Sequence, residues 1–306
     1  MNAPLQPTRL NKSSKSSKSN KFSRLWTLLP LATLLFSSPA LAQDPFRTGS
    51  DARPIGPTLE SAFEDFFRTG EFQNASQKLN KAQAENPNEP LVYTLQAALA
   101  YQNGQRDKML AMTQKTRDVA QSIESKDPGR SHLYRGIAQG LEGSSYYLKD
   151  GFMGLPRALT YVTSMFLEID RARQLTPDDP EVNLFVGYID LLLNKYDDAL
   201  KEFRKAGPPY LAFRGQALVM RDTKAYPQAQ AMAEKALAAA PRNAELHYLK
   251  AQTLALQNKP EAALASFNKA LELGKQLPQS TKIQLMRERD TQIKLVSANK
   301  AVSLKP

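Results

Sequence analysis

The chain of 306 residues has no cysteine and only two histidines. Without cysteine it cannot form disulfides, thiolate nucleophiles, cysteine-ligated zinc sites or iron–sulfur clusters, and it cannot carry a lipid on an N-terminal cysteine. His132 and His247 are far apart in the sequence, which argues against a multi-histidine metal centre. We therefore expect neither a metal site nor a cofactor.

Acidic residues are missing from the N-terminal segment, where much of the positive charge is found. The formal net charge is +11, and six of the 41 basic residues lie in 1–42 together with no acidic one. The remaining residues carry 35 basic and 30 acidic side chains. This small excess is a weak electrostatic attraction for polyanions, so we expect no nucleic-acid partner.

Residues 1–42 have the organisation of an export signal. A basic, serine-rich start leads into an apolar stretch at 25–36, and the small residues Ala40 and Ala42 mark a signal-peptidase site. The apolar stretch is well short of the roughly 20 residues that span a bilayer as a helix, so a permanent anchor is the weaker interpretation. We expect cleavage after Ala42 and export to a periplasm or an equivalent lumen. An organelle transit peptide is the alternative.

The rest of the chain begins with a segment rich in proline and glycine and continues with a repeated pattern. We expect residues 43–57 to be a flexible linker. Downstream, Ala199, Ala229 and Ala263 each follow another small residue by 12 positions, and they are spaced by 30 and 34 residues. The earlier members of these pairs are Gly187, Ala217 and Ala251. Paired small residues at a regular interval predict stacked helical hairpins whose two helices cross closely.

This pattern resembles the tetratricopeptide repeat, which has a 34-residue period. The matching stretches are 194–206, 224–229 and 258–270, and the resemblance extends over about residues 56–277. It implies an all-α solenoid of about six antiparallel hairpins in residues 58–277. We expect residues 278–306 to form a capping helix and tail. The apolar face of that helix comprises Ile283, Met286, Ile293 and Val296. Together with the export signal, the repeats resemble those of exported bacterial proteins, with a cyanobacterial source as one option.

The middle of the chain departs from the repeat. Residues Met109 and Ala199 hold equivalent repeat positions, yet the interval between them exceeds two periods. We assign the surplus to an insert at about 143–156, with Tyr146, Tyr147, Phe152 and Met153 as its aromatic and apolar side chains. The insert is either an exposed loop that docks a partner or a membrane, or a segment whose side chains pack back into a gap. The upstream glycines 136, 140 and 143 have helical spacing and predict a close helix–helix contact.

No sequence pattern predicts catalysis. Ser131 and His132 are neighbours on a predicted helix, where successive side chains point about 100° apart, so they are no catalytic dyad. The acidic pairs at 178–179 and 197–198 precede predicted helices, where carboxylates cap the free N–H groups. We expect that the protein is not an enzyme.

The resemblance implies a concave groove, lined by the first helix of each hairpin, that binds a protein or peptide. Its expected residues are Glu64, Arg68, Tyr101, Tyr188, Arg214, Arg221, Tyr248 and Gln252. Family members that bind chaperone tails carry a lysine and asparagine clamp where Glu60 and Glu64 stand here, so that activity is not expected. We predict a scaffold or adaptor. The alternative is an envelope-associated assembly factor that touches membrane or cell wall through the insert.

Overall fold

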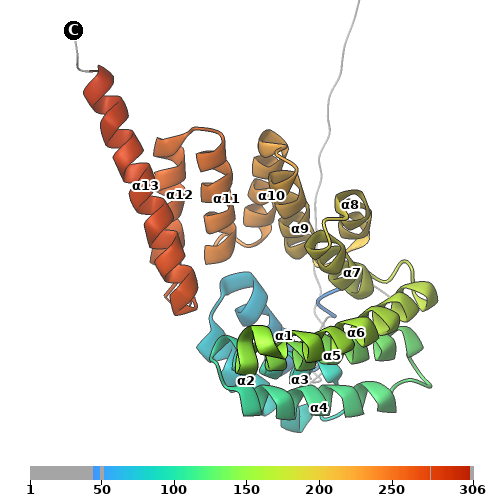
Figure 1. Ribbon diagram of the computed structural model, residues 1–306. Coiled ribbons are helices and arrows are strands. Elements are labelled where there is room, and N and C mark those ends of the chain that lie inside the picture. The colour runs from blue at the N-terminus through green and yellow to red at the C-terminus, as the bar shows by residue number, and fades with distance from the viewer. Residues whose placement is uncertain (1–43, 49–51, 276, 304–306) are drawn as a thin grey trace, which may run out of the picture. The chain divides into compact units, whose positions relative to one another are not determined.

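The computed structural model describes residues 44–48, 52–275 and 277–303, and the predicted signal peptide lies outside these ranges. Within them the chain forms thirteen α-helices, one π-helical segment and one 3₁₀ turn, and contains no β-strand (Figure 1). The all-α fold class predicted from the sequence is therefore confirmed.

The helices form six hairpins and a final single helix. In the first hairpin α1 (Pro57–Phe63) continues into the π-helical η2 (Glu64–Thr69) and pairs with α2 (Phe72–Glu85). The following pairs are α3 (Pro90–Gln102) with α4 (Arg106–Ser122), α5 (Pro128–Asp150) with α6 (Leu155–Leu175), α7 (Pro180–Leu192) with α8 (Tyr196–Lys205), α9 (Pro209–Asp222) with α10 (Tyr226–Ala239), and α11 (Ala244–Leu256) with α12 (Pro260–Leu273). The last helix, α13 (Gln279–Ser303), packs on α12. The described chain is thus a solenoid of six hairpins with a C-terminal cap.

A residue with positive φ stands in the tight turn of five hairpins. It is Asn194, Lys224 or Asn258 in the fourth, fifth and sixth hairpins, with φ of 57°, 64° and 57°. Gly70 and Gly104 take the same place in the first two. A left-handed residue reverses the chain after the first helix, which is why glycine and asparagine are favoured here. Lys224 takes this conformation although it has neither the missing Cβ of glycine nor the short polar side chain of asparagine.

The small residues predicted from the repeat lie at the helix crossings. Ala199, Ala229 and Ala263 are fully buried. A Cβ added to Gly187 would come within 2.8 Å of the Phe203 ring, so a larger residue would push the fully buried phenylalanine out of place. The periodic small residues therefore mark the close contacts on which the hairpin stack depends.

The segment expected to be a flexible linker is instead packed against the repeats. In its described part, Phe46 is 7% exposed and Ile55 is 4% exposed, and the Phe46 ring meets the edge of Phe63 at a centroid distance of 5.2 Å. The guanidinium of Arg47 pairs with Asp44, Asp179 and Glu181. The linker prediction was wrong because it weighed only proline and glycine content. The few apolar and charged side chains find partners, Phe46 on Phe63 and Arg47 on carboxylates 132 and 134 residues away.

A buried ionic cluster, here called the Glu181 cluster, holds this segment in place. Its members are Asp44, Arg47, Arg53, Glu89, Asp127, Arg130, Tyr134, Asp179 and Glu181. Glu181 is fully buried in the first turn of α7, 3.0 Å from the Nε of Arg130 on α5 and 3.2 Å from Arg47. Asp179 caps the same helix, as the sequence predicted, by accepting from the backbone N–H of Glu181 at 2.9 Å. The cluster thus joins the N-terminal segment to three helices of the solenoid.

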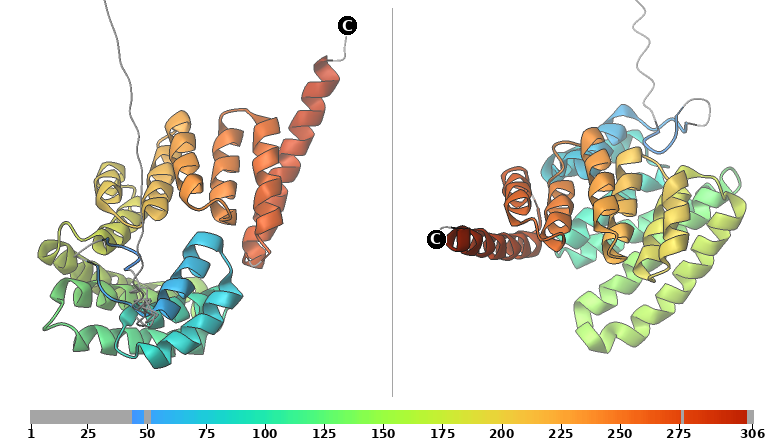
Figure 2. Two further views of the ribbon diagram at one scale, coloured as in Figure 1. Left: turned by 180° about the vertical axis from the view of Figure 1, so that it is seen from behind. Right: turned by 90° about the horizontal axis from the view of Figure 1, so that it is seen from above.

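The surplus residues in the middle of the chain lengthen two helices and do not form an inserted loop. The lengths of α5 and α6 are 23 and 21 residues, and a four-residue 3₁₀ turn at Gly151–Gly154 joins them. A Cβ added to Gly136 or Gly140 would lie 2.8 Å from the side chain of Ile169 or Met165, which confirms the predicted helix contact. The hairpin extends beyond its neighbours (Figure 2) because α5 and α6 are longer than the helices beside them, with 23 and 21 residues against 17 in α4 and 13 in α7.

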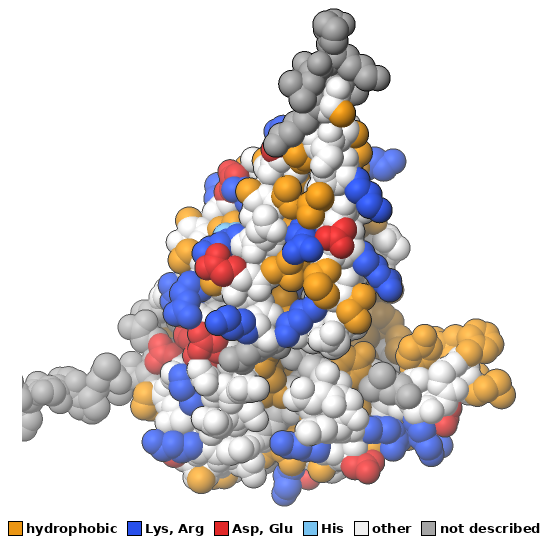
Figure 3. Space-filling model, turned by 90° about the vertical axis from the view of Figure 1, so that its left-hand side faces the viewer, with side chains coloured by type: hydrophobic (Ala, Val, Ile, Leu, Met, Phe, Trp, Pro, Cys, Tyr) orange, Lys and Arg blue, Asp and Glu red, His pale blue; other side chains and the backbone are white. Residues whose placement is uncertain are grey.

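The capping helix packs with a different face from the one predicted. Ile283, Met286 and Ile293 are 38%, 38% and 42% exposed, whereas Leu285 is fully buried and Gln292 is 7% exposed. Apolar residues occur on two sides of α13, so apolar spacing alone could not select the packing side. Figure 3 shows exposed apolar side chains along the upright part of the molecule, which ends in this helix.

Candidate functional site

Three adjoining cavities follow the inner side of α9 and α11. The first, of about 210 Å³, and the second, of about 200 Å³, share Arg214 and Glu245. The second and the third, of about 520 Å³, share Arg221 and Gln252. Neighbouring cavities share lining residues, so the three lie next to one another along the two helices; this row of cavities is here called the α9–α11 groove. Four of the eight residues predicted to line a groove are found in it: Arg214, Arg221, Tyr248 and Gln252.

Arg214 is the centre of a polar arrangement near the start of the groove. It donates to the Tyr188 hydroxyl at 3.1 Å and to Glu245 at 3.0 Å, and its guanidinium carbon lies 5.7 Å from the centroid of the Tyr188 ring. The Arg214 side chain is 30% exposed, so it is oriented by its partners and still reaches solvent. Tyr188 does not line the three cavities. Its ring packs against Phe203, and its hydroxyl holds the Arg214 side chain in place.

Glu288 on the capping helix joins the far end of the groove. Its carboxylate accepts from the Tyr248 hydroxyl at 2.9 Å, from Gln252 at 3.1 Å and from Gln284 at 2.9 Å. Arg221 in turn donates to the Gln252 carbonyl at 3.0 Å. Burial and the hydrogen bond to Glu288 raise the pKa of Tyr248, so this hydroxyl stays protonated and donates. Sequence reasoning missed Glu288, since the resemblance assigns no groove position to the cap.

The first hairpin closes the opposite end of the groove. The Asn243 amide donates to the Phe67 carbonyl at 2.7 Å, and Arg68 Nε donates to the Ala239 carbonyl at 2.9 Å, across about 170 residues of sequence. Arg68 also pairs with Glu64 at 2.9 Å. Arg68 therefore fastens the hairpin, Glu64 pairs with it, and neither of these predicted groove residues lines the three cavities. Tyr101, on α3, is 43% exposed and does not line these cavities.

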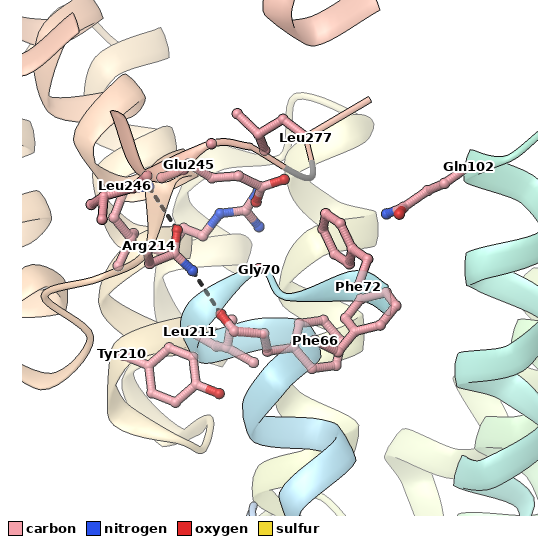
Figure 4. A pocket seen from close by; sticks show the side chains of 15 residues that line it. Phe66, Gly70, Phe72, Gln102, Tyr210, Leu211, Arg214, Glu245, Leu246 and Leu277 are labelled. Carbon is pink, nitrogen blue, oxygen red and sulfur yellow. Dashed lines mark hydrogen bonds and ion pairs between the residues drawn. The ribbon is translucent and has the colours of Figure 1, made fainter. Parts of the chain in front are cut away.

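An aromatic cavity lies where the first hairpin meets the groove. Figure 4 shows Arg214 and Glu245 on one side of it and the rings of Phe66 and Phe72 on the other. The centroids of these two rings are 5.3 Å apart in an edge-to-face arrangement. Tyr210 lines the cavity from α9 and is 4% exposed. Phe66, Phe72 and Tyr210 were not predicted as site residues, because only the long-range closure brings them together.

The end of the long α5–α6 hairpin, here called the hairpin tip, bears exposed apolar side chains. Tyr147, Phe152 and Met153 are 57%, 80% and 83% exposed. Tyr146, by contrast, packs back, with its ring stacked on Tyr161 at 5.3 Å and Arg157 lying over it. Three of the four residues predicted for the insert are therefore exposed, as one interpretation expected, and Tyr146 packs back against the hairpin, as the other expected. The tip is the projecting apolar area to the right in Figure 3.

Ser131 and His132, the two neighbours considered for catalysis, have different surroundings. The Nδ1 atom of His132 lies 2.6 Å from Glu168, while Ser131 is fully buried. In the described ranges, three or more His, Asp or Glu side chains do not come together in a way that could hold a metal ion. The helices described here also include none with the length and apolar character needed to cross a membrane.

One part of the chain matches a known repeat family. Residues 216–278, from within α9 to the start of the cap, match the tetratricopeptide repeat family model. This segment is therefore similar to tetratricopeptide repeats. It contains three of the four predicted residues that line the groove, namely Arg221, Tyr248 and Gln252. No curated protein matches the chain.

Several solved tetratricopeptide-repeat structures are similar to the chain at low identity. A repeat protein of Parabacteroides merdae is 16% identical, with 76% of this chain and 99% of that chain covered and a TM-score of 0.39. The TPR2AB domain of yeast Sti1, in a complex with pHSP90, is 14% identical, with 77% and 97% covered and a TM-score of 0.35. A thermophilic repeat protein of Thermus thermophilus is 16% identical, with 78% and 97% covered and a TM-score of 0.32. At such low scores these likenesses carry no information about partner or activity.

Proposed function

We propose that the protein is an exported, non-catalytic scaffold that binds a segment of a partner protein in the α9–α11 groove. The observation that carries the proposal is the row of three neighbouring cavities along two successive hairpins. Partly exposed arginine and tyrosine side chains line them, and these residue types are enriched at interface hot spots. A row of cavities along two helices suits an extended or helical peptide better than a small metabolite.

The charges in the groove favour a partner segment of mixed or no net charge. Arg214 is matched by Glu245, and Arg221 has Asp222 at 2.8 Å. A strongly acidic tail would have to displace these carboxylates, so we expect it to bind poorly.

The test is a crosslinking pull-down from native cell envelope with the variant Arg214→Gln/Arg221→Gln. Both side chains are partly exposed, so the variant should fold. The matched control is Arg171→Gln/Lys201→Gln, which removes two charges from exposed positions on α6 and α8. We expect one specific protein to be recovered by the wild type and the control, with at least tenfold lower recovery by the groove variant. Equal recovery by all three proteins would remove the groove from the proposal.

A second candidate function is contact with membrane or cell wall through the hairpin tip. The exposure of Phe152 and Met153 at the end of a projecting hairpin favours it, because soluble monomers rarely display adjacent large apolar side chains at such a place. Flotation with liposomes should then depend on these side chains. Equal flotation of wild type and Phe152→Ser/Met153→Ser would exclude lipid contact through the tip.

Export is part of the proposal and has its own test. The basic start, the apolar stretch at 25–36 and the small residues before position 43 support a cleaved signal peptide. N-terminal sequencing of the protein from the cell envelope should give Gln43 as the first residue. A mature chain that keeps residues 1–42 would contradict it.

A further inference from the structure

The turn end of the first hairpin, residues 64–72, is here called the lid. It consists of the π-helical η2, the left-handed Gly70 and the start of α2. None of the residues in 64–72 is buried, whereas Leu59, Ala62 and Phe63 in the preceding α1 are fully buried. The base of the hairpin therefore belongs to the core and the lid does not. Segments with few buried apolar contacts have the lowest free energies of local opening.

Hydrogen bonds between helix ends hold the lid against the turn between α10 and α11. The Asn243 amide donates to the Phe67 carbonyl at 2.7 Å. Arg68 Nε donates to the Ala239 carbonyl at 2.9 Å. Both acceptors lie at the end of a helix, because Phe67 is in the last turn of η2 and Ala239 ends α10. Such carbonyls have no partner inside their own helix, so water can replace the donors when the lid opens.

The rest of the contact is loose. Arg242 pairs with Glu71 at 2.9 Å, but the two side chains are 69% and 31% exposed, and such a pair contributes little. Between the lid and the wall formed by α9 and α11 lies the aromatic cavity of about 210 Å³, with Phe66 and Phe72 on the lid side (Figure 4). Side chains that face a cavity lose dispersion contacts there. The lid is thus held closed by contacts that are individually weak.

The backbone of the lid differs from that of the hairpin base. In η2 the closing hydrogen bond runs from the Gly70 N–H to the Asp65 carbonyl, and π-helical turns of this kind are rare and frequent at functional sites. The base is fixed on both helices, since the Phe63 ring meets Phe46 and Leu79 of α2 is fully buried. Movement of the lid therefore leaves the base in the stack.

The lid stands against the part of the wall that carries Arg214. Arg214 and Glu245 line the aromatic cavity together with the lid, and they also line the neighbouring cavity. A partner segment that extends along α9 and α11 past Arg214 meets the lid. We propose that the lid is autoinhibitory: it closes one end of the α9–α11 groove in the free protein and has to move away from the α10–α11 turn to admit a partner segment. What is admitted rests on the proposed function, whereas opening is a property of the chain alone.

The variant Arg68→Ala/Asn243→Asp weakens the closed lid without removing a helix cap. Aspartate at position 243 still accepts from the Leu246 N–H, but it replaces the amide donor by an acceptor that repels the Phe67 carbonyl. The matched control, Arg171→Ala/Asn268→Asp, makes the same two replacements at exposed positions on α6 and α12.

Opening is measured on the full chain by double electron–electron resonance. The chain has no cysteine, so Gln77→Cys and Ala238→Cys, at exposed positions on α2 and α10, carry the spin labels. We expect a longer distance whose population rises roughly 10- to 100-fold in the lid variant, as for a hydrogen bond turned into an unsatisfied contact. Amide hydrogen exchange in 64–72 should accelerate by a similar factor, with 57–63 unchanged. Unchanged distances, or equal acceleration of the base, would overturn the lid.

A lid fixed shut tests the autoinhibition. In Glu71→Cys/Arg242→Cys the thiols replace two paired side chains, and a short bis-maleimide joins them. The control is the same variant with each thiol blocked by N-ethylmaleimide. The locked protein should recover the envelope partner of the wild type about tenfold less well than this control. Equal recovery would overturn the proposal and leave the groove in place. If the wild type recovers no partner, the proposed function fails, and the distance measurement still decides whether the lid opens.

Discussion

Replacing Arg47 by methionine tests whether the N-terminal segment is a structural part of the fold. The Arg47 side chain is 7% exposed and contacts three carboxylates, and the Glu181 cluster contains five carboxylates but only three guanidinium groups. Arg47→Met leaves five carboxylates with two arginines. Removing one partner of a buried ion pair costs about 3–5 kcal/mol, because the remaining charges stay buried without compensation.

This cost corresponds to a large change in thermal stability. In a protein of this size each kcal/mol lowers the melting temperature by about 2–4 °C, so we expect a drop of roughly 6–20 °C in Arg47→Met. Circular dichroism at 222 nm, recorded during heating of the purified protein, measures it. Phe46→Ala gives an independent readout, because emptying a buried phenylalanine site costs about 3–5 kcal/mol.

The control for this experiment is Lys201→Met, which breaks a surface pair with Asp198 between side chains that are 68% and 47% exposed. Exposed pairs contribute little, so its melting temperature should stay close to that of the wild type. If Arg47→Met and Phe46→Ala melt no lower than this control, the packed segment is not part of the stable fold, and the linker interpretation is correct after all.

Three other predictions concern single positions. Gly143→Ala should lower the melting temperature more than Gly140→Ala. The added Cβ at position 143 would lie 3.2 Å from the backbone carbonyl oxygen of Ala158, whereas at position 140 it would meet the flexible end of the Met165 side chain. Equal losses in the two variants would contradict this. Lys224→Gly should raise the unfolding free energy in urea by about 0.5–1 kcal/mol by relieving the positive φ, and a decrease would refute the strain. Burial works to raise the pKa of Asp179, but the Arg47 hydrogen bond and nearby arginine charges outweigh it and lower the pKa. The stabilisation that ionised Asp179 gives to the fold is therefore present above pH about 4 and is lost on further acidification. Arg47→Met should begin to unfold at higher pH than the wild type in an acid titration, and an unchanged midpoint would exclude this coupling.

The local sequence pattern was sufficient for the class of fold and for the individual hairpins. Small residues at Ala199, Ala229 and Ala263 mark helix crossings, and the turn residues between paired helices follow from backbone conformational preferences. Both features depend on neighbours within one or two repeats. They can be inferred from the sequence because nearest-neighbour packing is the main source of order in a repeat array.

The site residues were predicted only in part, because the prediction relied on the same local repeat pattern. Arg214, Arg221, Tyr248 and Gln252 lie in the groove because each belongs to a first helix of a regular repeat. Glu288 was missed because it comes from the cap, which follows no repeat pattern. Glu64 and Arg68 were misplaced because the first hairpin contacts the far end of the solenoid.

The sequence by itself determined the helices, their pairing into hairpins and the order in which the hairpins stack, since these depend on side chains close together along the chain. Only the tertiary structure decided that Arg47 enters the Glu181 cluster, that the Phe67 carbonyl meets Asn243, and that Leu285 and not Ile283 faces the solenoid. Such contacts join residues that no spacing rule relates, and they form where curvature of the whole stack brings distant surfaces within reach. The aromatic cavity and its unpaired Tyr210 hydroxyl exist for that reason.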